Sequence, residues 1–251
     1  MAQIKANEAL VKALQTWNID HLYGIPGDSV DAVVDSLRTV RDQFKFYHVR
    51  HEEVASLAAA SYTKMTGKIG VALSIGGPGI VHLLNGMYDA KMDNVPQLII
   101  AGQTNSTLLG TKFFQETNIS KMVDDVAVYH HQIQKGDNVF EITNEAIRTA
   151  YEKKGVSVII CPNDLLTQKI KDTTNRAVDT TKPKPASPKF KSIKKAAKLI
   201  DKAKKPVMLI GLGTQHAKDE LREFIEAAKI PVIHTLPAKT ILPDDHPYSC
   251  L

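Results

Sequence analysis

Helical and strand-like patterns alternate along residues 1–165, and this alternation limits the fold more than any other feature of the sequence. Residues 6–17 place their apolar side chains on one helical face. The run QLIIAGQ at 97–103 is instead continuously apolar, which is typical of a strand buried on both faces. Helices that alternate with such strands indicate an α/β fold built on a parallel sheet.

Glycine turns end several of these segments. The strand-like HLYGIPG breaks at Gly24, and Asp28 or Ser29 is placed to cap the next helix. An alanine-rich helix starts near Glu52 and ends at Gly67, a typical C-terminal glycine. The apolar IGVALSIGG also runs into a glycine turn, and VSVIICP reads as the last strand of one compact domain.

Composition divides the chain into a first domain at 1–168, a linker at 169–190 and a second unit at 191–251. Threonine, lysine and proline dominate the linker, and X-Pro pairs favour extended backbone. The second unit begins another βαβ pattern, which predicts an incomplete Rossmann-like domain. Because a parallel sheet must be covered on both faces, we expect a fragment or truncated product. The alternative is a tail that packs onto the first domain.

Composition favours a soluble globular protein, since 43% of the 251 residues are hydrophobic and 24% are charged. No apolar run approaches the ~20 residues of a transmembrane helix. The charged start MAQIKANEALVKAL is unlike a secretory signal, so we expect a cytoplasmic protein.

Cys161 and Cys250 show no metal-binding spacing, and Cys161 is predicted to be a small core residue.

The net charge of +5 raises the question of a nucleic-acid partner. The lysines concentrate between Lys169 and Lys205 without interleaved aromatic residues. A solvated basic surface is the preferred interpretation, and no nucleic-acid partner is predicted.

Three short motifs carry little weight. The segment RHEEVA lacks the second histidine of an HExxH zinc site because Ala55 stands there, and the nine histidines show no metal pair. The turns at 76–79 and 211–213 have glycines but neither the GxGxxG spacing nor a Walker lysine. A nucleotide-binding protein remains a weaker alternative, and no metal ligand is predicted.

A combination of motifs is more specific than any of these. Four segments occur in order: GIPGDS (24–29), RHEEVASLAAASYTKMTGKIGV (50–71), SIGGPGIVHLLNGMYDA (74–90) and FFQET (113–117). Their order resembles the pyrimidine-binding domain of the thiamine-diphosphate-dependent pyruvate oxidase and acetolactate synthase group. RHEEVASLAAA and NGMYDAKMDNVP resemble the pyruvate oxidase branch most. The segments after the linker resemble the start of the group's middle domain.

The resemblance implies that Glu52 is the carboxylate that activates thiamine diphosphate. A carboxylic acid on the pyrimidine N1' favours the imino form of the cofactor, which removes the thiazolium C2 proton. Such an acid works best where burial favours its protonated form. An ordinary carboxylate at a helix N-terminus is the alternative, and it suits Glu53 equally well. Tyr62, ten residues after Glu52, matches the family's tyrosine and favours Glu52.

Other positions follow from the same resemblance. The cofactor-binding residues that it implies are Pro26, Gly27, Ser74, Gly77, Pro78 and Asn85. The substrate-side pair is Phe114 and Gln115, an aromatic wall and an amide donor. A plain turn at Pro26 and Gly27 and simple surface polarity at Gln115 are the alternatives.

The family's diphosphate and Mg²⁺ site is not found in the sequence. It belongs to a carboxy-terminal domain with a GDG motif, whereas this chain has only GDS at Gly27 and GDN at Gly136. In the family, the FAD site needs a complete middle domain, and each active site is built across a dimer. The resemblance therefore implies a homo-oligomer or a chain that supplies the missing domain.

The predicted parent activity is oxidative decarboxylation of pyruvate to acetate or acetyl phosphate, with oxygen or a quinone as acceptor. Acetolactate synthesis is the alternative enzyme. A truncated, non-catalytic dimerisation module is the alternative of another class.

Overall fold

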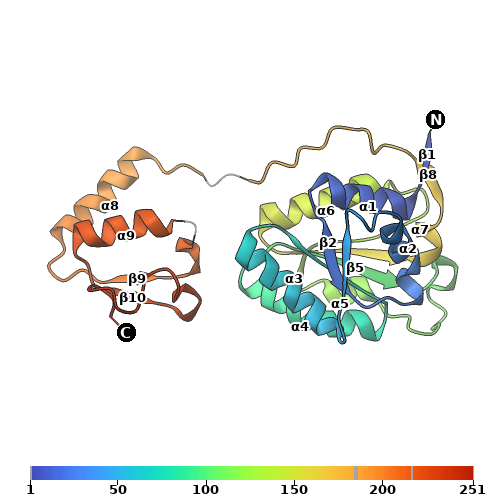
Figure 1. Ribbon diagram of the computed structural model, residues 1–251, viewed down its shortest axis with the longest axis horizontal. Coiled ribbons are helices and arrows are strands. Elements are labelled where there is room, and N and C mark those ends of the chain that lie inside the picture. Colours follow the sequence, from blue (N-terminus) through green and yellow to red (C-terminus); the bar gives the residue numbers. More distant parts are fainter. Residues whose placement is uncertain (1, 184–185, 216, 251) are drawn as a thin grey trace. The chain divides into compact units, whose positions relative to one another are not determined.

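The computed structural model describes residues 2–183, 186–215 and 217–250. Contacts divide the chain into two compact units, Met1–Lys184 and Pro185–Leu251 (Figure 1).

The first unit is built on a six-stranded sheet in which all neighbouring strands are parallel. The strands in sheet order are β3 (Lys45–His48), β2 (His21–Gly24), β4 (Gly70–Ser74), β5 (Gln97–Gln103), β7 (Val156–Pro162) and β6 (Ala127–Gln132).

Helices cover both faces of this sheet (Figure 1). One face carries α1 (Ala6–Thr16), α2 (Asp31–Thr39) and α6 (Val139–Lys153). The other face carries α3 (Glu52–Thr66), α4 (Pro78–Met92) and the short α5 (Ile119–Val123). Short elements complete the unit: the 3-10 turns η1 (Asp28–Val30) and η2 (Ser106–Leu108), helix α7 (Asn163–Leu166), and strands β1 (Gln3–Lys5) and β8 (Lys169–Lys171).

The central strands carry apolar residues on both faces because both of their faces are buried. In β5, Leu98 and Ile100 belong to the core under α1 and α6, whereas Ile99 and Ala101 belong to the core under α3 and α4. Successive side chains of a strand point to opposite faces, so a doubly covered strand has no polar side. The predicted α/β class with a parallel sheet is confirmed.

The strand order points to a ligand site beside β2. The chain reaches β3 on one side of β2 and β4 on the other, which makes β2/β4 the point where the strand order reverses. Open parallel sheets bind ligands beyond the carboxyl ends of the strands at such a point. Both glycine turns, 24–27 after β2 and 74–79 after β4, lie at this edge.

Two local features differ from what the sequence predicts. The edge strand β6 was not predicted, because its sequence AVYHHQ is half-exposed and lacks an apolar run. The helix expected to be capped by Asp28 or Ser29 begins later, since the turn η1 precedes α2 and neither residue supplies a side-chain cap.

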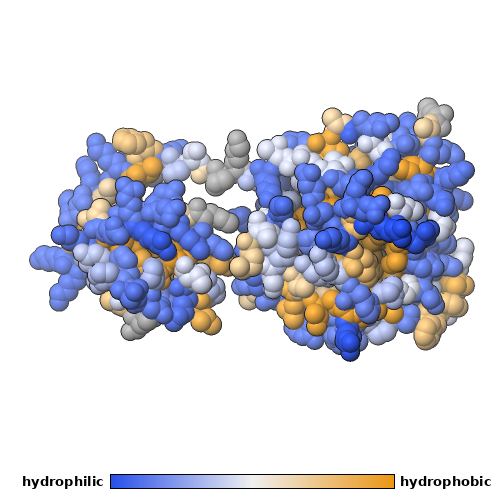
Figure 2. Space-filling model, viewed as in Figure 1, coloured by the Kyte–Doolittle hydropathy of each residue, from blue (hydrophilic) through white to orange (hydrophobic). Residues whose placement is uncertain are grey.

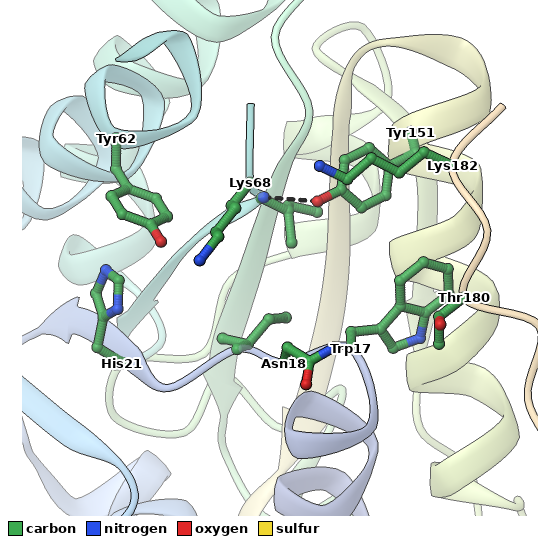
Figure 3. A pocket seen from close by; sticks show the side chains of 10 residues that line it. Trp17, Asn18, His21, Tyr62, Lys68, Tyr151, Thr180 and Lys182 are labelled. Carbon is green, nitrogen blue, oxygen red and sulfur yellow. Dashed lines mark hydrogen bonds between the residues drawn. The ribbon is translucent and has the colours of Figure 1, made fainter. Parts of the chain in front are cut away.

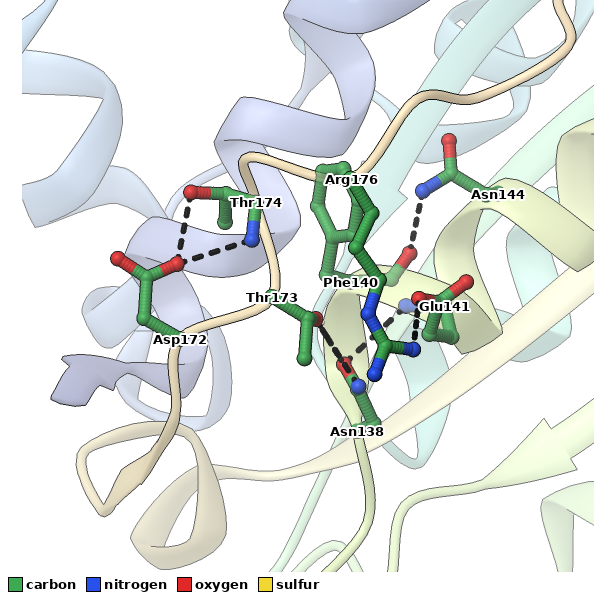
Figure 4. A network of polar contacts seen from close by, with 8 residues as sticks. All are labelled: Asn138, Phe140, Glu141, Asn144, Asp172, Thr173, Thr174 and Arg176. Atoms are coloured by element: carbon green, nitrogen blue, oxygen red, sulfur yellow. Dashed lines mark hydrogen bonds and ion pairs between the residues drawn. The ribbon is translucent and has the colours of Figure 1, made fainter. Parts of the chain in front are cut away.

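The predicted linker at 169–190 needs correction at both ends. Its first residues form β8, which pairs antiparallel with β1, and α8 begins at Phe190. The segment after β8 is also tied to α6, as Figure 4 shows. Asn138 Nδ2 donates to Thr173 Oγ1 at 3.0 Å, and Arg176 pairs with Glu141 at 3.3 Å. The threonines that suggested a linker form local hydrogen bonds instead.

The second unit contains α8 (Phe190–Lys202), β9 (Met208–Ile210), η3 (Leu212–Thr214), α9 (Lys218–Ala228), β10 (Val232–His234) and η4 (Leu236–Ala238). Strands β9 and β10 are parallel, as a βαβ unit requires. Its small core includes Ile210, Ile225 and Leu242, whereas no described residue of α8 is buried. None of the helices in the described part of the chain is long and apolar enough to cross a membrane.

The two cysteines are expected to react very differently with a thiol reagent. Cys161 is fully buried in β7, where desolvation raises the pKa of its thiol, while Cys250 is exposed. Because the thiolate is the nucleophile, a colorimetric thiol reagent should modify one cysteine in the native chain and two after denaturation. Fast modification of both in the native chain would contradict the buried position of Cys161.

Candidate functional site

The turns after β2 and β4 contact each other at the carboxyl edge of the sheet. The backbone N–H of Gly76 donates to Ser29 Oγ at 3.0 Å. A Cβ added to Gly27 would lie 2.6 Å from Ile75 Cγ2, so the two turns meet where only a glycine fits. The predicted Pro26–Gly27 and Ser74–Pro78 segments are therefore adjacent in space.

Glu52 lies at the same edge as the first residue of α3, and its side chain is only 11% exposed. His51 caps the helix, because its Nδ1 accepts a hydrogen bond from the Glu53 N–H at 3.3 Å. The helix N-terminus stabilises a negative charge by about 0.3–1 kcal/mol.

His82, in the first turns of α4, is the polar partner of this carboxyl group. Its Nδ1 lies 2.9 Å from Glu52 Oε2. At that distance the pair holds one proton, either as an imidazole N–H that donates to the carboxylate or as an acid O–H that donates to Nδ1. The other oxygen faces Gly79, where an added Cβ would be 3.4 Å from Glu52 Oε1.

The remaining residues of the β4 turn have distinct local roles. Ser74 is fully buried, and its Oγ donates to the Ile75 carbonyl at 3.0 Å. Gly77 has φ +60 and precedes Pro78, the first residue of α4. Proline suits that position because its fixed φ matches a helix and its missing N–H would be unpaired there. Asn85 lies further along α4, and its Nδ2 donates to the Glu53 carboxylate.

Phe114 and Gln115 line a cavity of about 310 Å³ at the same edge. Its walls include Ser29, Gly76 and Gln103, so it lies beside the two turns. Gln115 has φ +62, and its backbone contacts Gly77, where an added Cβ would be 2.9 Å from the Gln115 carbonyl oxygen. Phe114 is 78% exposed. Glu52 does not line this cavity; the 76–79 turn borders both the cavity and the carboxyl group.

The structure brings together two histidines that lie far apart in the sequence. The rings of His51 and His82 stack with centroids 4.4 Å apart. Neither the Glu52–His82 contact nor the stacking of His51 on His82 was predicted, because 30 residues separate Glu52 from His82. The only local signal was that His82 follows the glycine turn by one helical turn.

Comparison with known proteins identifies the two units. Residues 4–122 match the family model described as "Thiamine pyrophosphate enzyme, N-terminal TPP binding domain", and residues 193–251 match "Thiamine pyrophosphate enzyme, central domain". The chain belongs to the thiamine pyrophosphate enzyme family. Glu52, His82 and the cavity-lining pair all fall inside the matched N-terminal domain of this family.

Relatives within the family carry different names. The chain is 47% identical over 248 residues to YdaP of Bacillus subtilis, which is named as a putative thiamine pyrophosphate-containing protein. The aligned residues cover 99% of this chain and 43% of YdaP. It is 39% identical to the pyruvate oxidase of Lactiplantibacillus plantarum (97% and 41% covered). It is 34% identical to the acetolactate synthase of Mycobacterium leprae (97% and 40% covered). The chain thus spans about two fifths of the length of these curated relatives.

A second cavity, of about 170 Å³, opens at the opposite edge of the thiamine pyrophosphate enzyme domain (Figure 3). Tyr151 and Lys182 line it together with Trp17, and the Lys182 ammonium lies 5.1 Å from the centre of the Tyr151 ring. None of the predicted site residues lines this cavity. The chemistry predicted from the sequence therefore belongs to the carboxyl edge alone.

The loop that carries Gln115 is expected to loosen at acid pH. The Glu116 carboxylate accepts hydrogen bonds from the Gly110 N–H at 2.5 Å and the Phe113 N–H at 3.1 Å, and these bonds lower the pKa of Glu116. Because the pKa of Glu116 is lower in the folded state than in the unfolded state, ionised Glu116 stabilises the loop at pH values above its unfolded-state pKa. This stabilisation is lost as the pH falls through its folded-state pKa.

Hydrogen–deuterium exchange in peptides spanning 108–116 measures this effect. At neutral pH the Glu116→Gln variant should exchange faster than the parent, and the difference should disappear at acid pH. An equal rate in both proteins at neutral pH would contradict the role of Glu116.

Proposed function

We propose that this chain forms the pyrimidine-binding side of a thiamine-diphosphate- and FAD-dependent pyruvate oxidase. The observation that carries the proposal is a buried carboxyl group, Glu52, at the sheet edge where the strand order reverses. The 39% identity to a pyruvate oxidase supports this branch of the family.

The residues around Glu52 fit the pyrimidine ring of thiamine diphosphate. Gly79 leaves one carboxylate oxygen free of side-chain bulk, and His82 holds the other oxygen at 2.9 Å. When bound, the cofactor supplies the nucleophilic carbon that attacks the keto group of pyruvate. Glu52 serves as the acid that holds a proton at the pyrimidine nitrogen, and His82 orients it.

The turns supply shape more than charge. Pro26–Gly27 and Gly77–Pro78 present backbone to the ring, since a side chain at Gly27 would meet Ile75. Ser74 stabilises the second turn through the hydrogen bond that its Oγ donates to the Ile75 carbonyl. Asn85 acts through Glu53, to which it donates, and so fixes the start of α3.

The substrate side of the proposal rests on the cavity beside the 76–79 turn. Gln115 is held in a left-handed conformation, which a residue other than glycine seldom adopts without support from its surroundings. We assign its amide the role of a donor to the carboxylate or keto oxygen of pyruvate, with Phe114 as the apolar wall.

Mg²⁺ and FAD are assigned to no residue of this chain. The proposal places them on the carboxy-terminal domain and on the complete middle domain of the whole enzyme. The proposal includes either electron acceptor, oxygen or a quinone, and either product, acetyl phosphate or acetate. Acetolactate synthesis is the second candidate, because the chain is also 34% identical to an acetolactate synthase.

We also propose self-association through the outer faces of α3 and α4. These faces expose Val54, Met65, Val81, Tyr88 and Met92. Figure 2 shows apolar side chains gathered along the lower edge of the first unit, over α4. An apolar patch of this kind on a soluble protein marks an interaction surface.

Light scattering on the purified chain tests this surface. The double variant Met65→Lys, Met92→Lys should shift the chain towards monomer, because both side chains are mostly exposed and their charges would have to be buried between two copies. An unchanged molar mass, or a parent chain that is already monomeric, would contradict the proposed interface.

The activity itself is tested by pyruvate-dependent reduction of an artificial electron acceptor. The assay contains thiamine diphosphate, Mg²⁺ and FAD, with the chain alone and with a second chain that supplies the carboxy-terminal domain. Reduction that requires pyruvate supports the proposal. Acetolactate formed without acceptor reduction would favour the second candidate, and neither product in either mixture would contradict both.

A further inference from the structure

We propose that His51, Glu52 and His82 form a binding site for one divalent transition-metal ion of the zinc type. Within the described ranges, these three side chains are the one group of histidine, cysteine, aspartate or glutamate residues with ligand atoms all within 4.8 Å of one another. Two of them begin α3 and the third comes from α4, so the site joins the two helices.

The donor set selects the kind of metal. Two imidazoles and one carboxylate are a set that binds Zn²⁺ and leaves a fourth position open. Co²⁺, Ni²⁺ and Cu²⁺ also bind imidazole well. Mg²⁺ prefers oxygen ligands in octahedral geometry and keeps several waters, so it is a poor match for this set.

Small side-chain rotations are enough to close the site. Metal–ligand bonds of about 2.0–2.2 Å in a tetrahedron put the ligand atoms roughly 3.4 Å apart. His82 Nδ1 and Glu52 Oε2 are already 2.9 Å apart, and an ion between them would replace the proton that they share. The side chains of His51 and His82 are 46% and 44% exposed, so both rings have room to turn towards the ion.

The surroundings favour a cation. Glu53 Oε2 lies 3.8 Å from His51 Nδ1, and the same carboxylate accepts from Asn85. At that distance the carboxylate does not hydrogen-bond to the ring, but its negative charge attracts a cation to the site. Among the described salt bridges, none pairs these three residues with a lysine or an arginine.

One consequence rests on the proposed function. A metal ion on Glu52 Oε2 would remove the carboxyl group from the thiamine pyrimidine, and the two ligands would exclude each other. Zinc-type ions would then inhibit the enzyme, whereas Mg²⁺ would not.

The site is tested by titrating Co²⁺ into the untagged 251-residue chain, without thiamine diphosphate, and recording visible absorption. We expect one equivalent to bind with the d–d bands of a low-coordinate site, displaced by Zn²⁺ and retained in excess Mg²⁺. The variants His51→Gln and His82→Gln should each weaken binding by about 10-fold or more, since even the loss of a group that hydrogen-bonds to a metal ligand costs 10–100-fold. His130→Gln, on the edge strand β6, is the matched control and should bind as the parent does.

Two results would overturn the site: no cobalt binding by the folded parent chain, or equal affinity in His82→Gln and the parent. Circular dichroism of each variant shows whether it is folded, and Zn²⁺ calorimetry on the same variants provides a second measurement. Because the titration contains no thiamine, its outcome is independent of the proposed activity.

Discussion

Replacement of Glu52 by glutamine is expected to lower pyruvate-dependent acceptor reduction by about 10²–10⁴-fold, the range that a positioned acid or base contributes. Glutamine has nearly the same shape as glutamate but cannot hold a proton at the pyrimidine nitrogen. The carboxyl group is 11% exposed, and its polar partner is His82.

Glu53→Gln is the matched control for this prediction. Glu53 is the next residue of the same helix, and it stands at the same N-terminus. A glutamine there still offers an oxygen to Asn85, so most of the activity should remain. The rates are measured at saturating thiamine diphosphate, with cofactor binding followed separately. Equal losses in the two variants would show that the helix terminus matters and that Glu52 has no special role.

The fold was predictable where burial controls the sequence. The strands β4, β5 and β7 are covered on both faces, so their apolar runs are continuous and their positions follow from the sequence. The edge strand β6 has polar, half-exposed residues, and its pairing with β7 depends on contacts that no local pattern reveals. The threonine-rich segment after β8 was misread for the same reason, since its attachment to α6 is made by side-chain hydrogen bonds.

The candidate site shows a similar division. The glycine turns and the start of α3 were predicted from local patterns, whereas the roles of Gly27, Gly77 and Glu52 were implied by the family resemblance. The structure places all three at one sheet edge. The contact between Glu52 and His82 depends on how α3 and α4 pack, which the spacing of the residues does not encode. Asn85, which the resemblance implies is a cofactor-binding residue, donates to Glu53, and no local pattern indicated this partner.

Gly70→Ala is expected to destabilise the first unit by about 3 kcal/mol, the upper part of the range for overpacked sites. A Cβ at Gly70 would lie 2.0 Å from the backbone oxygen of Ala59, and the next nearest atoms, at 2.6 and 2.7 Å, are also backbone atoms of Ala59. Helix α3 therefore has to move away from β4. The Gly70 N–H also donates to Thr63 Oγ1 at 2.7 Å, and this bond would lengthen as the helix moves.

Gly155→Ala separates this backbone clash from the general effect of adding a methyl group. The three atoms nearest to its Cβ would all belong to the side chain of Val128, and no backbone atom is among them. We expect the melting temperature to fall by roughly 6–12 °C for Gly70→Ala and by clearly less for Gly155→Ala, at about 2–4 °C per kcal/mol for a domain of this size. Because α3 begins with Glu52, the same shift should also weaken thiamine diphosphate binding in Gly70→Ala. Equal melting temperatures in the two variants would mean that α3 can be displaced at little cost, and that its packing on β4 does not fix the position of the carboxyl group.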